Sequence, residues 1–277
     1  MPRLNAASHL TERIRLRLCS LWGYRGFVFG SVKREFQARY RNSLFGAAWT
    51  VLNPLAMILI YTLVFSQVMR ARLPGVDSSF AYSIFLMAGL LPWGLFTETL
   101  SRYQNMFLEN ANLIKKVSFP KLCLPLIGLL NSLVNFAIIF GLFLAFLLMS
   151  GNFPGWVAWS IIPLLLLQIL FTVGLGMLLG ILNVFFRDVG QFFPIFLQFW
   201  FWLTPIIYAV DIVPEAFRAP LTLNPLLPLF SAYQGIFVRG LWPEWSALLP
   251  LLVVSMLLNI VAFRLFRKRA GEMVDEL

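Results

Sequence analysis

The sequence predicts an all-α protein that crosses a membrane several times. Of its 277 residues, 60% are hydrophobic and only 12% are charged, and the mean hydropathy is +0.80. Soluble globular chains are about 45–50% apolar and roughly 25% charged. A chain of this composition has too little polar surface to face water on all sides, which excludes a soluble enzyme, a disordered tail and a fibrous repeat.

Six apolar runs are long enough to cross a bilayer, because a membrane-spanning helix needs about 20 mostly apolar residues. A cytoplasmic segment over 1–50 precedes them, and a short tail over 266–277 follows them. The spans, which together form one membrane domain over 51–265, are predicted at about 51–69, 80–101, 122–149, 157–183, 191–209 and 246–265.

Basic residues orient these spans, because segments rich in Lys and Arg stay in the cytoplasm. Of the 22 Lys and Arg residues, only Arg70, Arg72, Arg218 and Arg239 lie in the segments predicted to be external. The even number of spans then places both termini in the cytoplasm. The net charge of +10 is explained by this topology, and it does not indicate a nucleic-acid-binding face.

The segment over 1–50 is too polar to span the membrane and too apolar to be a solvated tail. Apolar residues recur at helical spacing at Phe29, Val32, Phe36, Tyr40 and Leu44, which predicts an amphipathic helix in the cytoplasmic interface, with its basic side toward anionic headgroups or a charged substrate. The alternative is an anchor that only sets topology. The length of the segment favours the interface helix.

Two further segments between spans carry their own pattern. Residues 105–124 predict a short cytoplasmic helix that ends by Pro120, with Leu113 and Ile114 as an apolar tip framed by charged and amide side chains. Such a tip indicates docking on a partner, although packing on the chain's own helices explains it nearly as well. Residues 210–245 are rich in both Pro and large apolar residues, which predicts short half-inserted external helices, with Asn224-Pro225 as a turn and helix start.

The predicted spans contain few titratable groups. Glu98 and Arg102 have the spacing of a helical ion pair, and the single histidine, His9, precedes the first span. Buried acids and bases are costly in a membrane and would stand out in an enzyme or an ion-coupled transporter. Cys19 and Cys123 both lie on the predicted cytoplasmic side, where thiols stay reduced. No metal site or cofactor is expected in this chain.

The chain also lacks the G-x-x-x-x-G-K-[ST] loop that cradles nucleotide phosphates. If ATP drives the protein, a partner subunit must bind the ATP and its Mg²⁺. Aromatic residues are abundant instead, with 28 Phe, 9 Trp and 7 Tyr, and they are densest over 191–209. Rings of this kind can stack on sugars along a translocation path, or they can face lipid and the membrane interface. The pattern supports the two readings equally.

Residues 33–55 carry the most specific motif, KREFQARYRNSLFGAAWTVLNPL. It resembles the entry to the first span in permeases of ABC-2 type polysaccharide exporters, which move O-antigen, capsular polysaccharide or teichoic acid. The resemblance covers roughly 25–265, and the end of span 1 is closest to the O-antigen branch. Further matches are LIKKVSFPK over 113–121, FRDV over 186–189, PIIY over 205–208 and NP over 224–225.

The resemblance implies a homodimer of six-span chains that pairs with two copies of a separate ATPase in a bacterial inner membrane. The substrate would be an undecaprenyl-linked polysaccharide, with a capsule or teichoic acid polymer, or a small amphiphile or drug, as the alternatives. The N-terminal helix would act as a cytoplasmic gate, a coupling helix over about 108–116 would dock on the ATPase, and spans 1 and 5 would line the path.

The resemblance, together with residue chemistry, assigns candidate site residues. Guanidinium groups suit phosphate oxygens, so the arginines beside the gate are expected at the lipid pyrophosphate. The substrate-entry residues are Arg34, Arg39, Tyr40 and Arg41; the path residues are Trp49, Phe196, Phe199 and Trp200; and the coupling residues are Glu109, Asn112, Leu113, Ile114 and Lys115.

Overall fold

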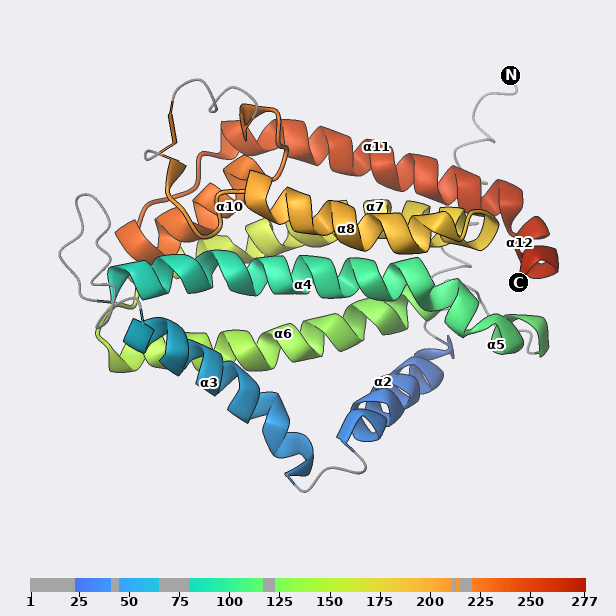
Figure 1. The fold of residues 1–277 in the computed structure, drawn as a ribbon, viewed down its shortest axis with the longest axis horizontal. Coiled ribbons are helices and arrows are strands. Elements are labelled where there is room, and N and C mark those ends of the chain that lie inside the picture. The colour runs from blue at the N-terminus through green and yellow to red at the C-terminus, as the bar shows by residue number, and fades with distance from the viewer. Residues whose placement is uncertain (1–22, 41–44, 65–79, 117–122, 211–212, 215–220) are drawn as a thin grey trace, which may run out of the picture.

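The computed structural model describes residues 23–40, 45–64, 80–116, 123–210, 213–214 and 221–277, and within these ranges the chain is helical. The longer helices run nearly parallel to one axis (Figure 1). The helices are α2 (Arg25–Tyr40), α3 (Trp49–Thr62), α4 (Ala81–Glu109), α5 (Ala111–Lys116), α6 (Cys123–Met149), α7 (Ile161–Phe185), α8 (Asp188–Leu203), α10 (Leu227–Gln234), α11 (Trp245–Arg269) and α12 (Glu272–Glu276), with short 3-10 turns at Gly46–Ala48 and Gly155–Ser160 and a π-helical turn at Gly235–Arg239.

Four of the described helices are long and apolar enough to cross a membrane. They are α4, α6, α7 with the 3-10 turn before it, and α11. The predicted span over 51–69 coincides in part with α3, which has 14 residues, and its last residues, 65–69, lie outside the described ranges. The predicted span over 191–209 coincides with α8, which has 16 residues. At 1.5 Å per residue, a 16-residue helix is about 24 Å long, less than the roughly 30 Å of a hydrocarbon core. The all-helical membrane fold is confirmed, and six complete spans stay a prediction.

Helix α4 forms the centre of the bundle (Figure 1). It packs on α6 on one side and on α7 on the other, and α11 packs on the far side of α7. Large side chains of α4, among them Phe96, Leu100, Tyr103 and Phe107, are at most 1% exposed. Polar side chains of α4, among them Thr99 and Gln104, are buried as well, and α4 is the least apolar and the most buried of the four long helices. Because polar groups are costly in contact with lipid, this composition explains why α4 occupies the middle position. It also continues past residue 101, where span 2 was predicted to end, to Glu109.

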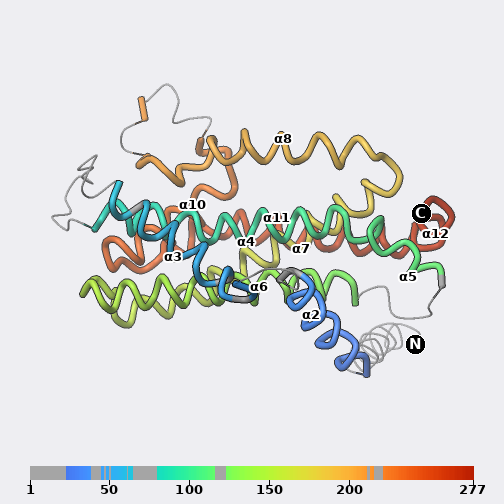
Figure 2. The backbone as a smooth tube through the Cα atoms, turned by 60° about the horizontal axis from the view of Figure 1, so that its bottom comes forward, coloured from blue at the N-terminus to red at the C-terminus, as the bar shows by residue number. Residues whose placement is uncertain are grey.

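Helix α8 lies apart from the other helices along most of its length. Figure 2 shows it on one side of α4, with α3 and α6 on the other side. Only Phe193 of α8 is buried. The helix ends at Leu203, earlier than the predicted 209, because Pro205 disfavours the helical conformation of the residue before it. Thr204 is accordingly extended, with φ −106° and ψ 123°.

The proline-rich segment folds back into the bundle beyond α8. Asn224-Pro225 makes the predicted turn: the backbone N–H of Leu227 donates to the Asn224 carbonyl at 3.1 Å, and α10 begins at Leu227. Phe230 and Tyr233 of α10 are fully buried. Tyr233 donates its hydroxyl proton to the Gln168 side-chain oxygen of α7 at 2.8 Å. Within the described part of this segment, α10 therefore belongs to the core, whereas Leu223 and Trp242 are exposed.

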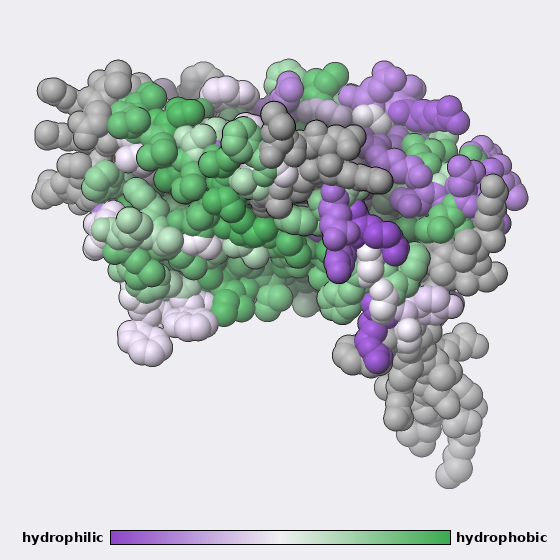
Figure 3. Space-filling model, turned by 90° about the horizontal axis from the view of Figure 1, so that it is seen from below, coloured by the Kyte–Doolittle hydropathy of each residue, from purple (hydrophilic) through white to green (hydrophobic). Residues whose placement is uncertain are grey.

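Polar residues gather at one end of the molecule (Figure 3), while apolar surface covers most of the rest of the face in view. Helices α5 and α12 lie at one end of the bundle in Figures 1 and 2, and α10 lies toward the other. Cys123 is a free, buried thiol; Cys19 lies outside the described residues.

Candidate functional site

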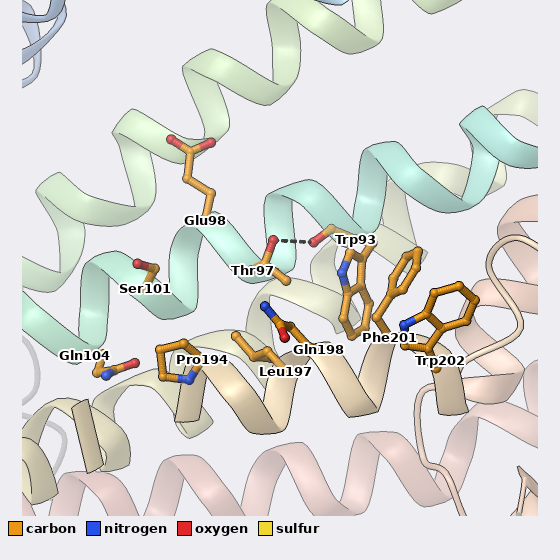
Figure 4. Close-up of a pocket in the computed structure, with 10 residues that line it drawn as sticks. All are labelled: Trp93, Thr97, Glu98, Ser101, Gln104, Pro194, Leu197, Gln198, Phe201 and Trp202. Atoms are coloured by element: carbon orange, nitrogen blue, oxygen red, sulfur yellow. Dashed lines mark hydrogen bonds between the residues drawn. The ribbon is translucent and has the colours of Figure 1, made fainter. Parts of the chain in front are cut away.

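A groove of about 560 Å³ separates α8 from α4 (Figure 4). Amide side chains hold both ends of α8. At the start of α8, the Gln104 amide of α4 donates to the carbonyl oxygen of Gly190 at 2.8 Å. At its end, the Trp200 indole donates to the Asn224 side-chain oxygen at 3.0 Å.

The lining of the groove combines polar side chains with aromatic rings. The aromatic residues are Trp93 of α4 and Phe201 and Trp202 of α8, and the rings of Trp93 and Phe201 lie 5.6 Å apart. The polar residues are Thr97, Glu98, Ser101 and Gln104 of α4 and Gln198 of α8.

Two of these polar groups are available to a ligand. Among the described residues, no side-chain hydrogen bond engages the Gln198 amide or the Ser101 hydroxyl. By contrast, the Thr97 hydroxyl donates to the carbonyl oxygen of Trp93 at 3.1 Å. Free hydroxyl and amide groups beside aromatic faces suit a ligand with many hydroxyl groups and flat apolar faces, which is the chemistry of a carbohydrate.

A polar network at the α5 end of the bundle joins α2, α4 and α6. Within α4, the predicted Glu98–Arg102 ion pair is confirmed, at 3.1 Å. Asn135 of α6 donates to the other oxygen of Glu98 at 2.7 Å. Glu35 of α2 accepts hydrogen bonds from Arg102 through one carboxylate oxygen and from Asn131 of α6 through the other. Two carboxylates thus share one guanidinium and two amides.

Glu35, Asn131 and Asn135 are functional candidates that the sequence reasoning did not find. Asn131 and Asn135 are four residues apart in an otherwise apolar span, so they face the same side of α6. Two amides at this spacing in a membrane helix are a pattern from which a polar site could have been predicted. Glu35 was placed only within the basic stretch before span 1, and its partners are distant in sequence. The network attaches α2 to the bundle, and α2 packs on α6.

We expect Glu35→Gln to loosen α2. The neutral side chain loses its charge-assisted bond with Arg102, but Glu35 is 45% exposed, so the loss is only about 0.5–1 kcal/mol. Amide exchange over residues 25–40 should therefore rise about two- to fivefold, measured by mass spectrometry in detergent. Gln37→Ala, an exposed change on the same helix, is the control. Equal exchange in the two variants would contradict this role of Glu35.

The substrate-entry candidates lie on or next to α2. Arg34 is exposed, and its guanidinium donates to the Ser31 hydroxyl at 2.9 Å. Arg39 and Tyr40 belong to the last turn of α2, where the structure describes the backbone and not their side chains. Arg41 lies outside the described residues. Val28 of the same helix is 2% exposed, whereas Phe29 is 65% exposed.

The path candidates occupy different environments. Phe199 is 66% exposed and Phe196 is 39% exposed. Trp200 packs edge-to-face on Phe96, with ring centroids 5.6 Å apart, in addition to its bond with Asn224. Trp49 of α3 is 40% exposed. Because α3 and α8 lie on opposite sides of α4 (Figure 2), one chain does not bring Trp49 near the rings of α8.

The coupling candidates divide between an exposed and a buried face of the α4–α5 corner. Glu109, Asn112 and Lys115 are exposed. Ile114 is only 8% exposed and belongs to an apolar cluster with Phe107, and the partly buried Leu113 packs against the same cluster. The sequence left open whether this apolar pair docks on a partner or packs on the chain's own helices. Ile114 packs on the chain's own helices.

Known proteins resemble this chain over most of its length. Residues 28–238 match the ABC-2 type transporter family. The chain is 33% identical over 259 residues to the O-antigen export system permease protein RfbA of Myxococcus xanthus. The aligned region covers 93% of this chain and 97% of that protein. A Klebsiella pneumoniae protein of the same name is 32% identical over 85% of this chain and 88% of its own length.

A more distant relative is the polysialic acid transport protein KpsM of Escherichia coli. It is 21% identical over 87% of this chain and 92% of its own length. The family match extends from α2 to the π-helical turn after α10, so it includes the groove, the polar network and α5. This chain belongs to the ABC-2 type transporter family and is a multi-pass membrane permease subunit, not an enzyme.

Proposed function

We propose that this chain is the membrane subunit of an ATP-driven exporter that moves a lipid-linked polysaccharide, undecaprenyl-linked O-antigen, across a bacterial inner membrane. The observation that carries the proposal is the similarity to O-antigen export permeases over 93% of the chain. The groove between α4 and α8 supports it, because its rings and free amide suit a glycan.

The proposed topology has six spans with both termini in the cytoplasm. Helices α3 and α8 would complete the two shorter spans, and the segment around α10 would form the half-inserted external helices. The end that carries α5 and α12 would face the cytoplasm. Helix α2 would then lie at the cytoplasmic interface as a gate, with the exposed Phe29 toward the headgroups.

The proposed assembly is a homodimer with two copies of an ATPase subunit, which binds ATP and Mg²⁺. The exposed face of Glu109, Asn112 and Lys115 would dock on the ATPase. The lipid pyrophosphate would meet Arg34, Arg39, Tyr40 and Arg41 at the gate. The glycan would then pass the aromatic residues of α3 and α8, including Trp49, Phe196, Phe199 and Trp200, and the groove.

The docking face is tested by affinity purification of the tagged chain in mild detergent and measurement of the intact-complex mass. We expect an equimolar ATPase with the wild-type chain. The double variant Asn112→Arg, Lys115→Glu should retain at most about a tenth as much ATPase, since a charge introduced at one position and reversed at another on a docking face costs roughly 1.4 kcal/mol or more. Both side chains are exposed, so the fold is preserved, whereas a charge at the buried Ile114 would disrupt the core.

The matched control is Glu244→Gln, an exposed change at the α10 end of the bundle. Loss of the ATPase in that variant as well would argue against a docking face on α5. The substrate is tested by deletion of the gene. Loss of surface polysaccharide supports the proposal, and intact polysaccharide with new drug sensitivity would assign the chain to small-amphiphile export.

A further inference from the structure

We propose that α12 braces α5, with Met273 as the positioning residue, so that a push on α5 is passed to α7 and α11. This rests on the proposed function in one respect, namely that α5 is the helix on which the ATPase docks. The burial and contacts of Met273 carry the inference.

Met273 joins α12 to the core of the α5 end. It is 3% exposed, although Glu272 and Asp275 beside it on α12 are exposed. It belongs to the same buried cluster as Ile114 of α5 and Phe266 of α11. Val274 and Leu277 pack around this cluster, and α12 contacts both α5 and α7.

Helix α5 cannot hold its own orientation. It has six residues, and isolated helices this short are unstable in water. On one side, a single residue, Asn110, links it to α4, and the Asn110 amide donates to the carbonyl oxygen of Met106 at 2.8 Å. On another side, α12 contacts it. Without α12, α5 would keep its packing on α4 but would lose its support on the side of α12.

Helix α12 is itself fixed to α11. Arg269 at the end of α11 forms an ion pair with Glu272 at the start of α12. The backbone N–H of Val274 donates to the Gly271 carbonyl oxygen at 2.9 Å, which closes the turn between the two helices. The ring of Phe266 stacks on Phe107 of α4, 5.9 Å between centroids. The contacts therefore run from α5 through α12 to the ends of α11, α4 and α7.

This arrangement allows a displacement of α5 by the ATPase to reach the membrane helices in two ways, directly through α4 and also through α12. A force on Asn112 and Lys115, on the exposed face of α5, presses Ile114 into the buried cluster that contains Met273. Because packed apolar clusters transmit strain and compress little, α7 and α11 would move together with α4. Without the packed Met273 side chain, α5 would tilt and the spans would receive only part of the displacement.

The test compares Met273→Ala with the rescue variant Met273→Leu and with Asp275→Asn on the exposed face of α12. In purified protein, amide exchange over 111–116 should rise about tenfold in Met273→Ala and stay within twofold of wild type in the other two variants. In vesicles that hold the complete exporter, Met273→Ala should still hydrolyse ATP but should move about fivefold less polysaccharide per ATP.

Unchanged exchange over 111–116 in Met273→Ala would overturn the brace. A parallel fall of transport and hydrolysis, with an unchanged ratio, would overturn its role in coupling. Failure of the proposed function has a different signature, namely a wild-type chain that retains no ATPase. In that case the exchange measurement still decides whether α12 positions α5.

Discussion

Asn224→Ala is expected to destabilise the fold by about 2–4 kcal/mol, because one buried amide makes four hydrogen bonds. Asn224 is 8% exposed. Its oxygen accepts the N–H of Trp200 at 3.0 Å and that of Leu226 at 3.1 Å. Its nitrogen donates to the carbonyl oxygen of Leu203 at 3.1 Å and to the Thr204 hydroxyl at 2.8 Å.

The alanine variant leaves two donors without an acceptor, and no other described side chain replaces the amide. The temperature at which half of the protein stays monodisperse in detergent should fall by roughly 5–10 °C. Trp200→Phe removes one of the four bonds and should lower that temperature by a smaller amount. Ser231→Ala, an exposed change on α10, is the control. A melting temperature for Asn224→Ala equal to that of the control would show that the amide does not hold α8 to α10.

The Asn224 site also shows what the sequence could predict. The Asn-Pro pair predicted a turn and a helix start, because proline excludes a helix before it and suits the first helical turn. The same holds for Glu98 and Arg102, whose spacing places them on one helical face. These predictions are local: the turn and the ion pair are confirmed, and the helix begins slightly later than predicted, at Leu227, with Pro228 in its first turn. That the Asn224 amide would also hold the Trp200 indole depends on how α8 and α10 pack, which no local pattern contains.

The boundaries of the spans were less predictable for a physical reason. Hydropathy identifies apolar runs, but a helix ends where its backbone hydrogen bonds end. Helix α4 continues past residue 101 to Glu109, because polar residues end an apolar run without interrupting the helical hydrogen bonds. Helix α8 ends at Leu203 although apolar residues follow, because of Pro205. The end of α6 and the start of α11 were predicted within a residue, since no such conflict occurs there.

The sequence predicted which types of residue form the candidate site, but it did not predict how these residues are arranged in space. The dense aromatic residues of α8 indicated a path, but the groove depends on the partners of those residues on α4, such as Gln104 and Ser101. Glu35 and Asn131 are 96 positions apart in the chain. Their contact follows from how α2 packs on α6, and the periodicity of one sequence does not predict how two distant helices pack.

Gly180→Ala is expected to have the second large effect, because α4 and α7 touch at the backbone there. A Cβ atom at Gly180 would overlap the carbonyl oxygen of Tyr103, and a Cβ at Gly176 would lie 2.9 Å from the Tyr103 Cβ. Two small residues four apart allow close approach of membrane helices. Tyr103 is 1% exposed and cannot move aside, so the two helix backbones must separate.

Separation of α4 from α7 would cost about 3 kcal/mol, at the upper end for an overpacked core, and would lower the melting temperature in detergent by roughly 6–10 °C. Gly141→Ala in α6 is the matched control, since a Cβ there meets no atom within 4 Å. It should be neutral or slightly stabilising, because alanine favours a helix more than glycine does. Equal stability of the two variants would mean that α4 and α7 do not touch at Gly180. A loss confined to Gly180→Ala would instead support a close backbone contact between α4 and α7 at Tyr103, next to Gln104 of the groove.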